Sequence, residues 1–242
     1  MKRRAFLGIC AAVVAAPSVR AQDAVDAMRF SALKPAAPLP AGLRAFAFER
    51  QARQTEYALV EDEGRTVLRA RADASTSGII RELRVDPRVH PILVWRWKVT
   101  RVLDKSDLAT KAGDDFPARL YVTFDVALES LSAAERLRIG AARMRYGPDV
   151  PVAALCYVWD TKAPAGTLAP SAYTDRVRMI VVDSGSANVG RWVAHRRHVV
   201  EDFRRAFGAD APAINGVIVS TDTDNTGETA EAHYGDVEFR AR

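Results

Sequence analysis

Cysteine is scarce in this 242-residue sequence, which contains only Cys10 and Cys156. Cys10 lies in an N-terminal segment that we expect to be removed, so no intramolecular disulfide can form in the remaining chain. The fold must therefore be stabilised by a hydrophobic core, and about 220 residues are enough to build one as a single domain.

Several sequence motifs of well-known enzyme classes are also missing. The chain has no glycine-rich phosphate loop, no dinucleotide fingerprint, no Gly-x-Ser-x-Gly elbow and no His-Glu-x-x-His. These absences argue against a nucleotide-dependent enzyme, a serine hydrolase of the elbow type and a zincin.

Residues 1–21 have the pattern of an export signal peptide. Lys2, Arg3 and Arg4 precede the apolar run Ala5–Ala16, and Val19-Arg20-Ala21 offers a small-residue cleavage site. The run is too short for a transmembrane helix, so no membrane span is expected after the signal is removed. The paired arginines resemble a twin-arginine signal, with the Sec route as the alternative. We expect a periplasmic or secreted protein.

Removing this segment lowers the formal net charge from +5 to about +1. The high isoelectric point is therefore partly a property of the signal, and no nucleic-acid partner is expected.

The rest of the chain reads as mainly β. Residues 22–40 are rich in Ala and Pro and predict a leader on the surface, and 41–242 predict a single domain. Alternating apolar and polar residues predict about ten short strands, with one inserted helix over Ser132–Arg145 and one short helix over Val200–Phe207. Because strands and helices do not alternate, we expect an antiparallel β-sandwich of jelly-roll type.

Two predicted strands, Ile92–Val99 and Ala118–Asp125, each have one apolar and one polar face. The polar faces contribute to a candidate ligand-binding surface, because arginine forks suit carboxylates and anionic sugars. A wet outer sheet face with cross-strand ion pairs is the alternative. The residues expected to bind ligand are Arg96, Lys98, Asp114, Asp115, Arg119, Tyr121, Arg176 and Arg178.

Carboxylates could also form an acid–base pair. Asp114 and Asp115 are adjacent, and neighbours in a strand point to opposite faces, so a catalytic partner of Asp115 would be distant. The candidates are Glu82, Asp175 and Asp222. The alternative is a loop held by carboxylate–arginine pairs, with Arg119 as the donor.

The loop Asp222–Glu228 carries oxygen ligands at alternate positions, as a calcium loop does. Asp222 and Asp224 are the candidate ligands, and Asp236 could complete the site from the last strand. The loop departs from the EF-hand pattern at Thr226, and a turn held by Asp and Asn side chains is the other reading. Apart from calcium, no cofactor is expected.

Aromatic, histidine and cysteine residues offer further candidates for function. Trp95 and Trp97 are expected in the core, whereas Trp159 and Trp192 lie nearer loops and could stack on a sugar, with simple packing as the alternative. The run His195–His198 lacks a third zinc ligand and predicts a solvated basic face. Cys156, within an apolar strand, predicts a buried thiol.

Several strings of residues together resemble one bacterial family. They are RELRVDP (81–87), WRWKV (95–99), KAGDDFPARLYVTFD (111–125), ALCYVWD (154–160), AYTDRVRMIVVDSG (172–185), EDFRRAFG (201–208), STDTDNTGE (220–228) and AHYGDVEF (232–239). The chain is similar to domain of unknown function 3047 from about Leu39 to Phe239. The resemblance implies an exported domain, similar to carbohydrate-binding modules in fold, and brings no activity or cofactor with it.

Three hypotheses about function follow. The first is a non-catalytic envelope protein that binds a carbohydrate or another anionic small ligand on a polar sheet face. The second is a glycan-cleaving hydrolase or lyase that uses Asp115 and a second carboxylate. The third is a structural or assembly role with a protein partner in the envelope, which predicts an exposed apolar patch.

Overall fold

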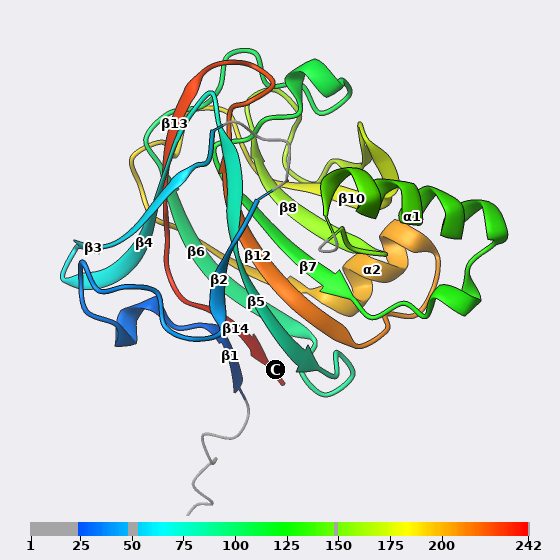
Figure 1. Cartoon of the computed structure of the whole chain (residues 1–242). Helices are drawn as coiled ribbons and strands as arrows, with labels where there is room; N and C mark the ends of the chain where they lie inside the picture. Colours follow the sequence, from blue (N-terminus) through cyan, green and yellow to red (C-terminus); the bar gives the residue numbers. More distant parts are fainter. Residues whose placement is uncertain (1–23, 48–52, 148–149, 242) are drawn as a thin grey trace, which may run out of the picture.

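The computed structural model describes residues 24–47, 53–147 and 150–241, and the chain over these ranges forms two packed sheets of seven strands each (Figure 1). The predicted β-sandwich is confirmed. The predicted signal over 1–21 lies outside the described residues.

The first sheet, sheet A, has the order β1-β14-β6-β13-β4-β3, and β11 pairs with β6 beside this path. All of its pairings are antiparallel. Its strands are β1 (Ala24–Met28), β3 (Glu56–Asp62), β4 (Arg65–Asp73), β6 (Ile92–Val99), β11 (Val193–His198), β13 (Thr229–Tyr234) and β14 (Val237–Arg240).

The second sheet, sheet B, has the order β2-β5-β12-β7-β8-β10-β9. The pair β8–β10 is parallel, which is an exception to the antiparallel arrangement that the sequence predicts. Its strands are β2 (Leu43–Phe46), β5 (Thr76–Val85), β7 (Arg119–Phe124), β8 (Ala154–Asp160), β9 (Leu168–Ser171), β10 (Thr174–Ser184) and β12 (Ile214–Asp222).

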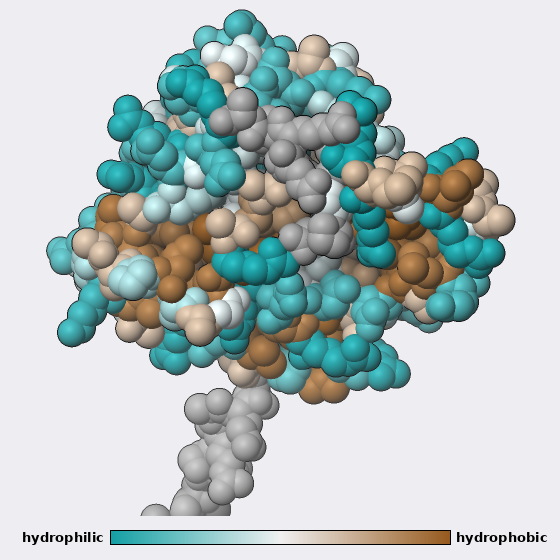
Figure 2. Space-filling model, in the orientation of Figure 1, coloured by the Kyte–Doolittle hydropathy of each residue, from teal (hydrophilic) through white to brown (hydrophobic). Residues whose placement is uncertain are grey.

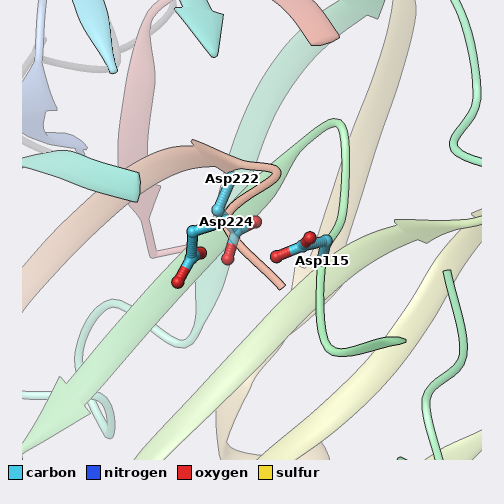
Figure 3. Close-up of side chains that lie close together, drawn as sticks. All are labelled: Asp115, Asp222 and Asp224. Atoms are coloured by element: carbon cyan, nitrogen blue, oxygen red, sulfur yellow. The ribbon is translucent and has the colours of Figure 1, made fainter. Parts of the chain in front are cut away.

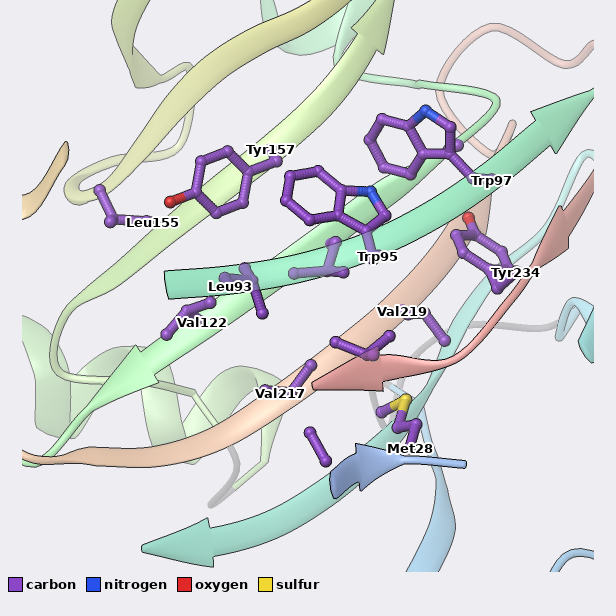
Figure 4. Close-up of a cluster of buried hydrophobic side chains, with 14 of the residues drawn as sticks. Met28, Leu93, Trp95, Trp97, Val122, Leu155, Tyr157, Val217, Val219 and Tyr234 are labelled. Atoms are coloured by element: carbon purple, nitrogen blue, oxygen red, sulfur yellow. The ribbon is translucent and has the colours of Figure 1, made fainter. Parts of the chain in front are cut away.

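The core lies between the sheets. Trp95 and Trp97 of β6 meet Tyr157 of β8 and Tyr234 of β13 there, with ring centroids of Trp95 and Tyr157 5.1 Å apart (Figure 4). Both tryptophans are buried as predicted. Strand alternation explains this, since Arg96, the residue between them, points to the opposite face of β6.

Two helices lie beside sheet B (Figure 1). Helix α1 (Ala133–Tyr146) begins with the predicted capping box, in which Ser132 and Glu135 bond each other's backbone amides. Helix α2 (Val199–Phe207) packs Phe203 against Phe124 and ends at Gly208, whose φ of 69° favours glycine. In α1, Leu137 and Met144 remain exposed, and Figure 2 shows hydrophobic surface on this side of the molecule.

Three expectations about strands are wrong. Residues 24–28 are strand β1 rather than a surface leader, because Met28 and the following Phe30 are apolar and fill the core. Residues 230–240, whose alternation predicts a single strand, form two strands that both pair with β6, because an extra residue interrupts the pairing around Gly235. The segments 92–99 and 118–125, which we expect from the sequence to be neighbouring strands, do not pair: β6 belongs to sheet A and β7 to sheet B.

Candidate functional site

The predicted basic surface is divided over three places, so the expectation of one common face is wrong. Arg96 and Lys98 alternate with the core residues of β6 and lie on the outer face of sheet A. Arg119 and Tyr121 lie on the outer face of sheet B, opposite core residues Leu120 and Val122. The physical reason is that the two predicted strands belong to different sheets.

Arg176 and Arg178 occupy the third place, in the first half of β10 near the helices. Arg176 donates to the carbonyl of Val152 at 2.9 Å and pairs with Glu135 of α1. The guanidinium of Arg178 lies 5.6 Å from the ring centroid of Phe207 in α2. In β10 these two residues alternate with Met179, which packs in the hydrophobic cluster on the outer face of sheet B. They share a face with Ile180, which belongs to the core between the sheets.

Arg119 is the centre of a buried polar network on sheet B. Its Nε donates to Asp222 Oδ1 at 2.8 Å and its Nη1 to Asp114 Oδ1 at 3.3 Å, and it also donates to the hydroxyl of Tyr121. Only 3% of the Arg119 surface is exposed. A loop covers this face, because Leu108 and Phe116 pack over Cys156 and Val158 of β8. The alternative prediction of a loop held by carboxylate–arginine pairs is confirmed here.

Asp115 lies close to Asp222 and Asp224, and carboxylate oxygens of the three residues are within 4.8 Å of one another (Figure 3). Asp115 Oδ1 accepts from Asn225 Nδ2 at 3.0 Å, and Oδ2 accepts from the backbone amide of Thr226 at 2.6 Å. Of the three proposed catalytic partners, the structure therefore brings Asp222 to Asp115.

Burial dominates the electrostatics of this cluster. It raises the pKa of Asp222 to about 8, although Arg119 opposes the shift, and the neighbouring Asp115 adds to it. Burial also raises the pKa of Asp114. The carboxylates of Asp114, Asp115 and Asp222 act on one another beside the Arg119 guanidinium, so a proton held by one of them reduces their mutual repulsion.

The other predicted partners lie elsewhere. Glu82 of β5 pairs with Arg44 of β2 at 2.7 Å, and Asp175 is exposed near the start of β10. Asp236, a predicted calcium ligand, instead accepts from the backbone amide of Ser31 at 2.8 Å and from its hydroxyl at 2.5 Å. The prediction of Glu82 or Asp175 as the partner of Asp115 is therefore wrong. The prediction of Asp236 as a calcium ligand is also wrong, because the strand that follows it, β14, pairs with β1 and does not lie at the acidic loop.

On the outer face of sheet A, Trp192 lies among cations. The guanidinium carbon of Arg96 is 4.3 Å from the Trp192 ring centroid, and Lys98 Nζ is 5.3 Å from it. Across the strands, His233 of β13 is paired with both Lys98 of β6 and Arg69 of β4. The sequence reasoning missed His233 and Arg69. Their alternation with the core residues of β13 and β4 could have placed them on an outer face, but the pairing of strands far apart in sequence could not be read.

The histidine prediction also needs correction. His195 is not part of a solvated face: its Nε2 lies 2.7 Å from Asp183 Oδ2, and only 11% of its side chain is exposed. It points inward beside Trp95 because the odd-numbered residues of β11 face the core. Cys156 is buried as predicted, and burial raises the pKa of its thiol to about 12.

A family model described as a protein of unknown function (DUF3047) matches residues 41–238. The chain belongs to the DUF3047 family. No curated protein matches this DUF3047 chain. In the described part of the chain, none of the helices has the length and apolar character to cross a membrane.

Among solved structures, this DUF3047 protein is similar to the glycoside hydrolase domain of Endo-D from Streptococcus pneumoniae R6. The identity is 11% and the TM-score 0.33, and the match covers 83% of this chain and 22% of the other. The DUF3047 chain thus spans under a quarter of that structure's length.

Proposed function

We propose that this protein is a non-catalytic binding domain that holds an anionic carbohydrate on the outer face of sheet A. The observation that carries the proposal is Trp192, whose ring lies within 5.3 Å of both Arg96 and Lys98. An aromatic ring offers an apolar surface to a pyranose, and a guanidinium fork beside it offers paired donors to a carboxylate or sulfate.

Buried polar atoms without a partner at the same place support a bound ligand. Trp192 Nε1 and His233 Nδ1 are both buried and have no hydrogen-bond partner in the described chain. Buried polar groups are normally paired, so a bound acceptor would relieve Trp192. The tryptophan and histidine rings lie 6.5 Å apart, close enough for one ligand to reach both.

The positive charge around Trp192 and His233 also favours an anionic ligand. Lys98 and Arg69 lie on either side of His233 in a row across three strands, so two positive charges lie on this part of the face. Burial and the charge of Lys98 lower the pKa of His233. Lys98 pairs with Asp62, whereas Arg96 and Arg69 have no ion pair among the described residues. An anion would neutralise the remaining positive charge.

The carboxylates favour binding over cleavage. Asp115 and Asp222 are the one predicted acid–base pair that the fold brings together, yet both are buried. Asp222 accepts from Arg119, and Asp115 accepts from the side chain of Asn225 and the backbone amide of Thr226. A glycosidase needs two carboxyls that reach one bond across a cleft. The glycan-cleaving hypothesis therefore ranks second.

The test is affinity electrophoresis of the chain with polygalacturonate, an anionic glycan, and with dextran, a neutral one. Trp192→Ala and Arg96→Gln should each weaken retardation by polygalacturonate about tenfold, as expected for loss of a charge-assisted contact. Arg84→Gln is the matched control, because Arg84 is an exposed arginine of sheet B.

Gly235→Ala sharpens the test without changing any charge. A Cβ at Gly235 would lie 2.6 Å from Arg96 Cγ, so the arginine must leave its place beside Trp192. We expect this variant to bind as weakly as Arg96→Gln. Equal loss in Arg84→Gln, or retardation by dextran alone, would contradict the proposal.

A further inference from the structure

We propose a second binding site, a hollow at one end of sheet B that accepts a compact organic ammonium ion. The hollow has a volume of about 490 Å³ and lies between residues 107–109, the end of β8 and strand β9. This volume is within the range of small-molecule pockets. Its walls carry two kinds of chemistry, apolar side chains and carboxylates.

The apolar part of the wall is continuous with a packed cluster. Leu108 belongs to the cluster that covers the outer face of sheet B, and Ala163 and Ala169 pack against it. Pro170 adds a further apolar surface. A compact hydrocarbon body placed here would bury apolar area from water, which favours binding.

The polar part is Asp160, at the end of β8. Its Oδ1 accepts from the backbone amides of Lys162 and Ala163, each at 2.6 Å. Its Oδ2 is buried and has no partner among the described residues. Only 1% of the residue is exposed, yet it lines the hollow. A buried carboxylate oxygen without a donor is unfavourable, and a ligand that brings an N–H would satisfy it.

The charges on the wall select an ammonium ion. Asp107 is a second carboxylate on the hollow, whereas Lys162 is the one cation that lines it. The ammonium of Lys162 does not satisfy Asp160 Oδ2, since that oxygen has no partner. The net charge of the wall is negative, so it favours a cation with N–H donors over an anion.

This site is independent of the proposed function. It lies on the other sheet from Trp192 and has the opposite charge preference. Failure of anionic glycan binding would leave it untouched, and the reverse also holds.

The experiment uses cyclohexylammonium as the probe and cyclohexanol as its neutral counterpart, with the ¹⁵N-labelled chain at pH 7. Binding is followed by NMR through the backbone amides of Lys162 and Ala163, which report on Asp160. We expect these signals to move with cyclohexylammonium at millimolar concentration and to respond about tenfold less to cyclohexanol.

Asp160→Asn is the decisive variant. Asparagine can still accept from both amides through its oxygen, but it places an NH₂ where Oδ2 was, so a cation should bind at least about tenfold more weakly. Ala169→Phe, which fills the hollow and leaves the carboxylate in place, should also abolish the response. Asp210→Asn, on an exposed aspartate that pairs with Arg204, is the matched control.

Three outcomes would overturn the proposal. The first is equal binding of cyclohexanol and cyclohexylammonium. The second is unchanged binding in both Asp160→Asn and Ala169→Phe. The third is no movement of the two amide signals at saturating cyclohexylammonium.

Discussion

The outer faces of the two sheets carry similar residues in opposite environments. On sheet A, Arg96 lies against Trp192 with no ion pair in the described chain. On sheet B, Arg119 is buried beneath Phe116 and pairs with Asp114 and Asp222. Both arginines alternate with core residues in their strands. The difference arises from the loop over residues 100–118, which covers Arg119 on sheet B, whereas Arg96 on sheet A remains half-buried beside Trp192.

This comparison indicates which arginine stabilises the fold and which is available to a ligand. A buried charge needs its partners, and removing one of them leaves the others unpaired in a medium of low dielectric constant. Arg96 is half-buried and has no ion pair in the described chain, so its removal leaves no buried carboxylate without a partner and should cost little stability. Arg119 is therefore structural, and Arg96 is the better ligand contact.

The largest expected effect is that of Arg119→Ala on stability. The change leaves Asp222 and Asp114 buried without their donor, so the free energy of unfolding should fall by about 3–5 kcal/mol. Urea denaturation measures it. Arg96→Ala is the matched control and should change the free energy of unfolding by less than about 1 kcal/mol. Similar losses in both variants would mean that the two faces do not differ.

The second effect is a dependence of stability on pH. The pKa of Asp222 is raised to about 8 in the folded chain, so the folded state holds a proton that the unfolded chain releases above pH 4. The stabilisation is present at low pH and is lost as the pH rises toward 8, at up to about 1.4 kcal/mol per pH unit.

Asp222→Asn removes this titration, and urea melts between pH 4 and pH 8 should show a shallower slope in the variant. Asp236→Asn removes an aspartate whose contacts lie with Ser31 and serves as the control. A slope unchanged by Asp222→Asn would show that the acidic cluster does not hold the proton.

The smallest expected effect is that of calcium. Arg119 already neutralises part of the acidic cluster, and both oxygens of Asp115 are bonded within the chain. We therefore expect the melting temperature to change by less than about 1 °C between calcium and chelator, below the roughly 2–4 °C that about 1 kcal/mol produces in a domain of this size. A large rise with calcium that disappears in Asp224→Asn would instead indicate a metal site.

Much of the local structure could be predicted. The pattern of Ile92–Val99 matches β6 residue for residue, and Ser132 with Glu135 marked the start of α1. The candidate site was predicted only in part: Asp115 and Asp222 do meet, but Arg96 and Arg119 do not share a face. Asp160 was missed because an unpaired carboxylate oxygen cannot be recognised from its neighbours in sequence.

The sequence by itself determined the sandwich, the buried tryptophans, the single buried thiol and the family, because each depends on local alternation or on distinctive strings of residues. Only the tertiary structure decided which strands share a sheet and which polar face is covered. Strand pairing depends on contacts between distant segments, so the one-residue alternation that predicts two faces does not say which of them meets water.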